Sequence, residues 1–172
     1  MRLFHVSEES DIQIFVPRLP VRKDLDQSKG LVWAINETCL PNFLTPRDCP
    51  RVTYHCNERT TEEDKQKYLS SQSSTHVIAI EHQWFEKMKN TTLYLYEFDP
   101  TNFYLQDRGA GYYVSEVTEI PINKIVITDV FAELINRNIE VRMTDQLWDL
   151  CECIQTTSFD WSICRMGNAK KK

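Results

Sequence analysis

Glycine is scarce in this sequence, with four among 172 residues. Loops that cradle phosphate groups with backbone N–H groups need closely spaced glycines, yet neither a G-x-x-x-x-G-K-[ST] nor a G-x-G-x-x-G pattern occurs. The G-x-S-x-G elbow of α/β-hydrolases and the H-E-x-x-H helix of zinc proteases are also missing. The commonest signatures of nucleotide-binding and hydrolytic sites are therefore excluded.

The sequence also lacks a long apolar run and a basic face. No stretch reaches the roughly 18 consecutive apolar residues of a membrane-spanning helix. The first residues become polar and acidic at Ser7 and Glu8, unlike a signal peptide. Net charge is −5, whereas a general binder of nucleic acid or of anionic membranes needs a positive surface. These absences predict a cytoplasmic protein that binds neither.

Six cysteines are present, but none belongs to a C-x-x-C pair. Without an export signal we expect all six to be reduced thiols. Cys151 and Cys153 lack the second pair of ligands that a zinc site needs, so the sequence predicts no metal.

Strand-like runs dominate the chain. Eight short segments rich in β-branched and aromatic residues predict strands at 2–6, 31–35, 51–56, 75–81, 92–98, 112–117, 124–127 and 139–142. Short helices are predicted at 37–44, 82–89 and 129–137, and a last one is capped by Thr144 or Asp145. Because strands do not alternate regularly with helices, this order favours an α+β fold over a doubly wound sheet.

We therefore predict a single α+β domain over residues 1–167. It would hold a mixed, strongly curved or split β-sheet with a cleft between its halves. Residues 168–172 end in three lysines and are predicted to form a flexible basic tail, because a short charge run is usually solvated.

Three strand-like segments carry side chains that a site can use. They are residues 3–7, 30–36 and 111–121. His5 and Ser7 share one face of the first strand, since they are two positions apart. Trp33 lies in the nearly continuous apolar run of the second, and the third contains the acidic residues Glu116 and Glu119.

In this order the three segments resemble the motifs of the ADP-ribosyltransferase superfamily, in particular its His-Tyr-Glu branch. The resemblance implies an ADP-ribosyltransferase-like fold, NAD as substrate, and transfer of ADP-ribose with release of nicotinamide. It implies that His5 and Ser7 hold NAD and that Trp33 stacks on nicotinamide. It also implies that Glu116 is the catalytic carboxylate, with Glu119 as the rival.

This chemistry is consistent with the residue types. Cleavage of the bond between nicotinamide and ribose builds positive charge on the ribose carbon, which a fixed carboxylate stabilises. An aromatic side chain holds the flat leaving ring by offset stacking. The sequence departs from the motifs at Val6, where the family has glycine, and at Trp33, where it has tyrosine. The resemblance is therefore compatible with an inactive protein as well.

The chain also resembles a small bacterial family of unknown function, through residues 3–7, 30–35 and 47–52. Two other functions stay open: a non-catalytic module that binds a small-molecule ligand or a protein in the same cleft, and an unrelated hydrolase or transferase that acts through His5 and a carboxylate. The transferase hypothesis requires His5, Trp33 and Glu116 to converge on one cleft. Each of the three residues also has a purely structural interpretation, as a hydrogen-bonded histidine, a core aromatic and a solvated carboxylate.

Overall fold

The structure is a computed structural model that describes residues 1–20, 23 and 26–172. Over these residues the fold is mixed α+β, as the sequence predicts, with ten strands in two sheets and four short α-helices. Neither sheet is strongly curled, so the prediction of strong curvature is wrong, and the strands are divided between two sheets instead. Within the same ranges no helix is long and apolar enough to cross a bilayer.

The chain folds into two compact units, each built from two separate stretches. Unit 1 comprises Met1–Phe43 and Leu93–Ile127, and unit 2 comprises Leu44–Thr92 and Thr128–Lys172. The sequence predicted one domain over residues 1–167. No flexible glycine- or serine-rich linker marks the three points at which the chain passes from one unit to the other. Composition alone therefore gave no sign of the division.

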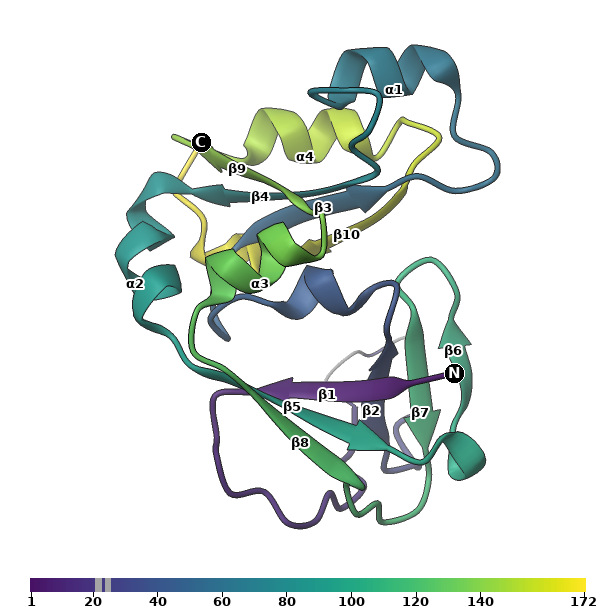
Figure 1. The fold of residues 1–172 in the computed structure, drawn as a ribbon. Coiled ribbons are helices and arrows are strands. Elements are labelled where there is room, and N and C mark those ends of the chain that lie inside the picture. The colour runs from purple at the N-terminus through teal and green to yellow at the C-terminus, as the bar shows by residue number, and fades with distance from the viewer. Residues whose placement is uncertain (21–22, 24–25) are drawn as a thin grey trace. The chain divides into compact units, whose positions relative to one another are not determined.

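Unit 1 holds a six-stranded antiparallel sheet in the order β6-β7-β2-β1-β5-β8 (Figure 1). Its strands are β1 (Leu3–Ser7), β2 (Val32–Asn36), β5 (Leu93–Phe98), β6 (Tyr104–Asp107), β7 (Tyr112–Ser115) and β8 (Asn123–Ile127), and its 3-10 turns are η1 (Leu40–Phe43) and η3 (Pro100–Asn102). Strand β5 pairs with the whole of β1, from Leu3 opposite Phe98 to Ser7 opposite Tyr94. The centre of the sheet thus joins the two stretches of the unit.

Alternation along the strands divides the side chains of this sheet between two faces. One face buries an apolar cluster made of Leu3, Phe15, Val32, Ala34, Tyr96, Phe98 and Phe103. The Tyr96 hydroxyl donates to the carbonyl of Glu9 at 2.6 Å and accepts from the N–H of Ile12 at 3.1 Å. These bonds fix the loop after β1, so that Phe15 packs edge-on against Tyr96 and Phe98.

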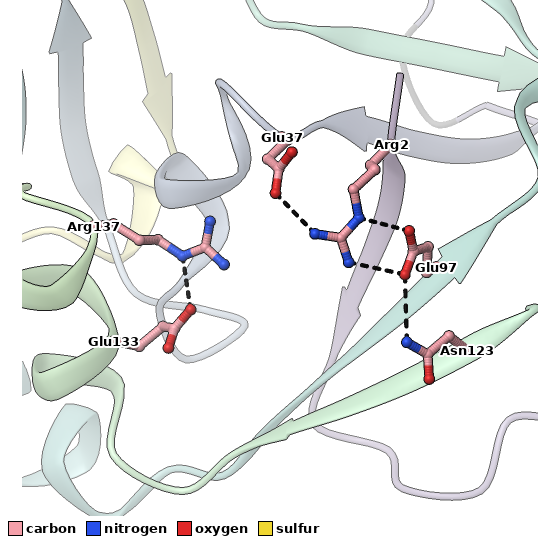
Figure 2. A network of polar contacts seen from close by, with 6 residues as sticks. All are labelled: Arg2, Glu37, Glu97, Asn123, Glu133 and Arg137. Carbon is pink, nitrogen blue, oxygen red and sulfur yellow. Dashed lines mark hydrogen bonds and ion pairs between the residues drawn. The ribbon is translucent and has the colours of Figure 1, made fainter.

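A polar cluster ties the start of β1 to β5 and β8. The Arg2 guanidinium donates to both carboxylate oxygens of Glu97, at 2.7 and 3.0 Å, and to Glu37 at 3.0 Å (Figure 2). Asn123 adds a bond to Glu97 at 3.4 Å. The bond from Arg2 is the main reason why the pKa of Glu97 is lowered. The cluster therefore holds the Glu97 carboxylate in its charged form.

Unit 2 holds a four-stranded sheet in the order β10-β3-β4-β9. Its strands are β3 (Arg51–His55), β4 (His76–Glu81), β9 (Glu140–Thr144) and β10 (Asp160–Cys164). Its helices are α1 (Glu62–Tyr68), α2 (Phe85–Asn90), α3 (Val130–Asn136) and α4 (Trp148–Ile154), with the 3-10 turns η2 (His82–Trp84) and η4 (Met166–Asn168). Strand β9 runs parallel to β4, whereas the other pairs are antiparallel. Helix α4 and the two central strands share one core, formed by Val52, Tyr54, Val77, Ala79, Leu147, Cys151, Ile154 and Phe159.

Side-chain oxygens accept backbone N–H groups at the start of α3 and of α4. Asp129 caps α3, as its carboxylate accepts a backbone N–H at 2.9 Å. The sequence predicted that Thr144 or Asp145 caps α4, but the N-cap is Leu147, whose side chain makes no capping bond, and the Gln146 side chain just before it accepts the N–H of Trp148 at 2.6 Å. Thr144 ends β9, and its hydroxyl donates to a backbone carbonyl of β4, so it belongs to the sheet.

Residues 168–172, predicted to be a flexible tail, make specific contacts within unit 2. The backbone N–H of Lys170 donates to both carboxylate oxygens of Glu81, at 3.0 and 3.1 Å. Lys172 pairs with Glu152 at 2.5 Å. The lysine run thus meets acidic partners that come from distant parts of the sequence.

Candidate functional site

Unit 1 contains a pocket of about 340 Å³. Its described lining residues are mostly apolar or aromatic, and they are Phe4, His5, Val6, Pro20, Trp33, Ala34, Ile35, Phe43 and Tyr112. They come from β1, β2, η1, the first residue of β7 and the loop before β2. No carboxylate is among them. The pocket is therefore an apolar site on the central strands of the sheet.

The pairing of β1 with β2 explains where the pocket forms. The two strands pair directly only at Leu3 with Asn36 and at Phe4 with Ile35. Beyond these two pairs, the His5 side chain makes the next hydrogen bond between the strands, with its Nδ1 3.0 Å from the carbonyl oxygen of Trp33. A carbonyl only accepts, so Nδ1 carries the proton in this bond, and Nε2 of the neutral ring is an acceptor. His5 thus links the two strands where their ladder ends.

The aromatic walls of the pocket support one another. The Tyr112 ring meets the Trp33 ring edge-on, with centroids 5.3 Å apart, and meets the Phe43 ring at 5.5 Å. Edge-to-face pairs of this kind add about 0.5–1.5 kcal/mol beyond the area that they bury. Trp33, Phe43 and Tyr112 are only partly buried, so part of their ring surface is open to solvent.

Gly111 positions Tyr112. Its φ of +69° is unfavourable for any residue with a Cβ. A Cβ built there would lie 2.6 Å from the Cys39 sulfur and 2.8 Å from the Asn36 side-chain oxygen. The Gly111 carbonyl accepts the N–H of Asn36 at 3.0 Å, which joins the turn before β7 to the end of β2. Only glycine fits at this contact.

Two of the four residues that the resemblance selects, His5 and Trp33, line the pocket. Their side chains nevertheless lie on opposite faces of the sheet. His5 is paired with Tyr96, and its ring contacts Phe15 at 4.9 Å on the side of the buried cluster. Trp33 is paired with Val114 and has its ring against Tyr112. His5 therefore reaches the backbone of Trp33 and not its indole.

Ser7 is not among the described lining residues. It ends β1 opposite Tyr94, and its hydroxyl accepts the N–H of Glu9 at 3.1 Å. This bond forms a local turn, which is a common role of serine. The predicted pairing of His5 with Ser7 in one site is therefore not seen in the pocket.

Glu116 also lies outside the described lining. It follows β7 directly and accepts bonds from Lys29 at 3.0 Å and from the Tyr104 hydroxyl at 2.9 Å. The bond from Lys29 is the largest cause of the lowered pKa of Glu116, which therefore stays ionised. The rival, Glu119, is buried and accepts the Ser115 hydroxyl at 2.5 Å. Neither carboxylate is brought to the pocket with Trp33.

Sequence reasoning missed three of the aromatic lining residues, Phe4, Phe43 and Tyr112. Phe4 could have been identified from the sequence, because strand alternation places its side chain on the opposite face of the strand from His5. Tyr112 reaches the pocket from β7, where its ring packs against Trp33 of the neighbouring strand β2. That these rings surround a common space depends on pairing between distant segments.

Among the residues that the structure describes, no group of three or more histidine, cysteine, aspartate or glutamate side chains is placed to hold a metal ion. All six cysteines are free thiols, and burial raises the pKa of Cys49 to about 12. A thiol of that kind is inert as a nucleophile near neutral pH.

Comparison with curated proteins found no match, and comparison with solved structures found none either. A family model described as "Family of unknown function (DUF6886)" matches residues 4–169. This confirms the resemblance to a family of unknown function, while the resemblance to ADP-ribosyltransferases stays a prediction. Because the match covers nearly the whole sequence, the chain belongs to the DUF6886 family.

Proposed function

We propose that unit 1 binds a small molecule that presents a flat, apolar ring to the pocket. The observation that carries the proposal is the composition of the walls, in which Phe4, Trp33, Phe43 and Tyr112 contribute aromatic rings. Such rings bind flat ligands by stacked or edge-on contacts. Small-molecule sites typically have volumes of about 300–1,000 Å³, and this pocket falls in that range.

Ligand binding in this pocket would also cost little conformational entropy. Tyr112 is already held between Trp33 and Phe43, so the walls lose little side-chain freedom when a ligand enters. The ring surface that these residues leave exposed would be covered, which favours binding by about 25 cal/mol for each Å² of apolar area. The preformed aromatic walls of the pocket therefore support a binding function.

Nicotinamide is the ligand to test first, because the resemblance assigns Trp33 to that ring. Thermal-shift and calorimetric titrations of the full chain with nicotinamide and with NAD are the measurements. We expect saturating ligand to raise the melting temperature by a degree or more. Trp33→Leu should weaken binding about tenfold, which corresponds to about 1.4 kcal/mol.

Trp161→Leu is the matched control, because Trp161 lies on β10 in unit 2 and is 39% exposed. It should leave the ligand response unchanged. Equal responses in the Trp33→Leu and Trp161→Leu variants would remove the pocket as the binding site. No response in the parent protein to any flat aromatic ligand at millimolar concentration would overturn the proposal.

ADP-ribosyl transfer is a second candidate. One observation favours it: His5 and Trp33, which come from different strands, line the same pocket. Glu116 directly follows Ser115, the last residue of β7, which is paired with Val32 beside Trp33. The chemistry would require this carboxylate to leave Lys29 and to stabilise the positive charge that develops on the ribose carbon.

Nicotinamide release from NAD separates this candidate from simple binding. Glu116→Gln should abolish release but retain NAD binding, because the carboxylate acts on charge that exists only in the transition state. Glu119→Gln is the comparison variant and should keep release if Glu116 is the catalytic group. Binding without release in the parent protein would leave the first proposal standing and end the second. Release that survives Glu116→Gln would transfer the role to another group, with Glu119 tested first.

A further inference from the structure

Glu81 is a fully buried carboxylate at the end of β4, and its exposed fraction is 0%. A buried carboxyl group needs hydrogen-bond partners to offset its lost hydration. It accepts the Gln83 side chain at 2.6 Å and the backbone N–H of Lys170 on both oxygens. The second donor comes from a segment 89 residues away in the sequence. A main-chain N–H thus helps to satisfy the hydrogen-bonding capacity of a buried carboxyl group.

The other polar groups of Lys170 are bound as well. Its carbonyl accepts the indole N–H of Trp148 at 2.7 Å, and its ammonium group donates to Asp145 at 2.7 Å. Asp145 directly follows Thr144, which is the parallel partner of Glu81, so the two acidic groups lie at the same ends of β9 and β4. The N–H, the C=O and the side chain of one lysine are therefore all recognised within unit 2.

A second basic position extends the pattern. Lys172 donates to Glu152 on α4 at 2.5 Å. Ala169 has the extended backbone angles φ −71° and ψ 156°. Contacts to main-chain N–H and C=O groups are available to any extended peptide, whereas Asp145 and Glu152 select for positive charge two positions apart.

We propose that Glu81, Asp145, Trp148 and Glu152 form a binding site for an extended peptide with basic residues at alternate positions, and that residues 169–172 occupy this site as an internal ligand. A basic segment of the same pattern, supplied by another chain, competes for it. Binding requires the internal segment to leave, because each of its contacts uses a group that the incoming peptide needs.

The test uses the full chain with Lys170→Pro and a capped peptide of the sequence Asn-Ala-Lys-Lys-Lys. Proline removes the N–H that Glu81 accepts, and it favours an extended residue before it, which Ala169 already is. We expect the variant to have a lower melting temperature than the parent protein. Millimolar peptide should restore part of this loss and should shift the parent much less, because its own segment fills the site.

Two controls keep the result specific. A peptide in which the first and third lysines are replaced by glutamine should not restore stability, and Asp145→Lys in the Lys170→Pro background should remove the response. If Lys170→Pro does not fold, the double variant Lys170→Ala, Lys172→Ala keeps the N–H and should respond to the lysine peptide more strongly than the parent. An unchanged melting temperature in Lys170→Pro, or equal responses to the lysine and glutamine peptides, would overturn the proposal.

Discussion

Acidification should destabilise unit 2 through a pair of buried histidines. His55 and His76 are opposite each other on β3 and β4, with ring centroids 5.0 Å apart, and they are 8% and 6% exposed. Burial lowers the pKa of His76 to about 3, and the neighbouring His55 adds to the effect. Burial lowers the pKa of His55 too, although Asp160 at 4.0 Å opposes this. Both rings are therefore neutral in the folded protein at pH 7.

The sign of the effect follows from these directions. An unfolded histidine has a pKa of about 6.5, so as the pH falls the unfolded chain binds protons that folded His76 does not. The contribution of His76 to the free energy of unfolding is complete above pH 6.5 and is lost as the pH falls towards 3. With a folded pKa of about 3, the loss between pH 8 and pH 5 is about 2 kcal/mol. His55 adds a loss in the same direction.

Urea unfolding at pH 8, 7, 6 and 5, followed by tryptophan fluorescence, measures this loss. Three of the four tryptophans lie in unit 2, so the signal reports mainly on that unit. His76→Phe keeps an aromatic ring at the position but cannot be protonated. Between pH 8 and pH 5, the free energy of unfolding of this variant should therefore decrease by about 2 kcal/mol less than that of the parent protein. His82→Gln, at an exposed position, is the control. A parent slope that persists in His76→Phe would refute the assignment to this buried ring.

Three further predictions concern single residues. Gly111→Ala should lower the free energy of unfolding by about 1–3 kcal/mol, because a Cβ meets Cys39 at a positive φ; Gly167→Ala, with open space around it, should be close to neutral in the same denaturant titration. Gln146→Ala should lower the free energy of unfolding by about 1 kcal/mol, because it removes the side-chain acceptor of the Trp148 N–H at the start of α4; Thr144→Ala should cost less, and thermal unfolding that ranks them in the opposite order would contradict this role of Gln146. Thiol titration in denaturant without reductant should count six thiols, and a count of four or fewer would show a disulfide.

The secondary structure of this chain was largely predictable because its signals are local. Each of the eight predicted strand segments overlaps an observed strand, because runs such as 76–81 are rich in residues that suit a buried sheet. Asp129 marked the start of α3, where a short polar side chain precedes an apolar stripe. Strands β6 and β10 were missed. In β10, Asp160–Cys164 mixes polar and apolar residues and is defined by its pairing with β3.

The candidate site was predictable only in part. His5 and Trp33 were identified from two separate motifs, and both line the pocket. Tyr112 reaches the pocket because β7 pairs with β2, a contact across almost eighty residues that no local pattern contains. The position of Lys170 also depends on a residue that is distant in the sequence. The lysine run predicts solvation on its own, while its position is decided by Glu81, which the sequence places far away.

The interleaving of the two units has a consequence for synthesis. During synthesis β1 leaves the ribosome long before β5, with which it pairs along its full length. Leu3, for example, can pair only after Phe98 has been synthesised. The stretch 44–92 emerges in between, but its own sheet still lacks β9 and β10 until residue 164. Contacts between residues so far apart in the sequence form slowly, and strand edges that are still unpaired promote aggregation. Expression at reduced temperature, or with chaperones that shield exposed strands, should therefore raise the yield of folded protein more than it does for a protein with local strand pairing.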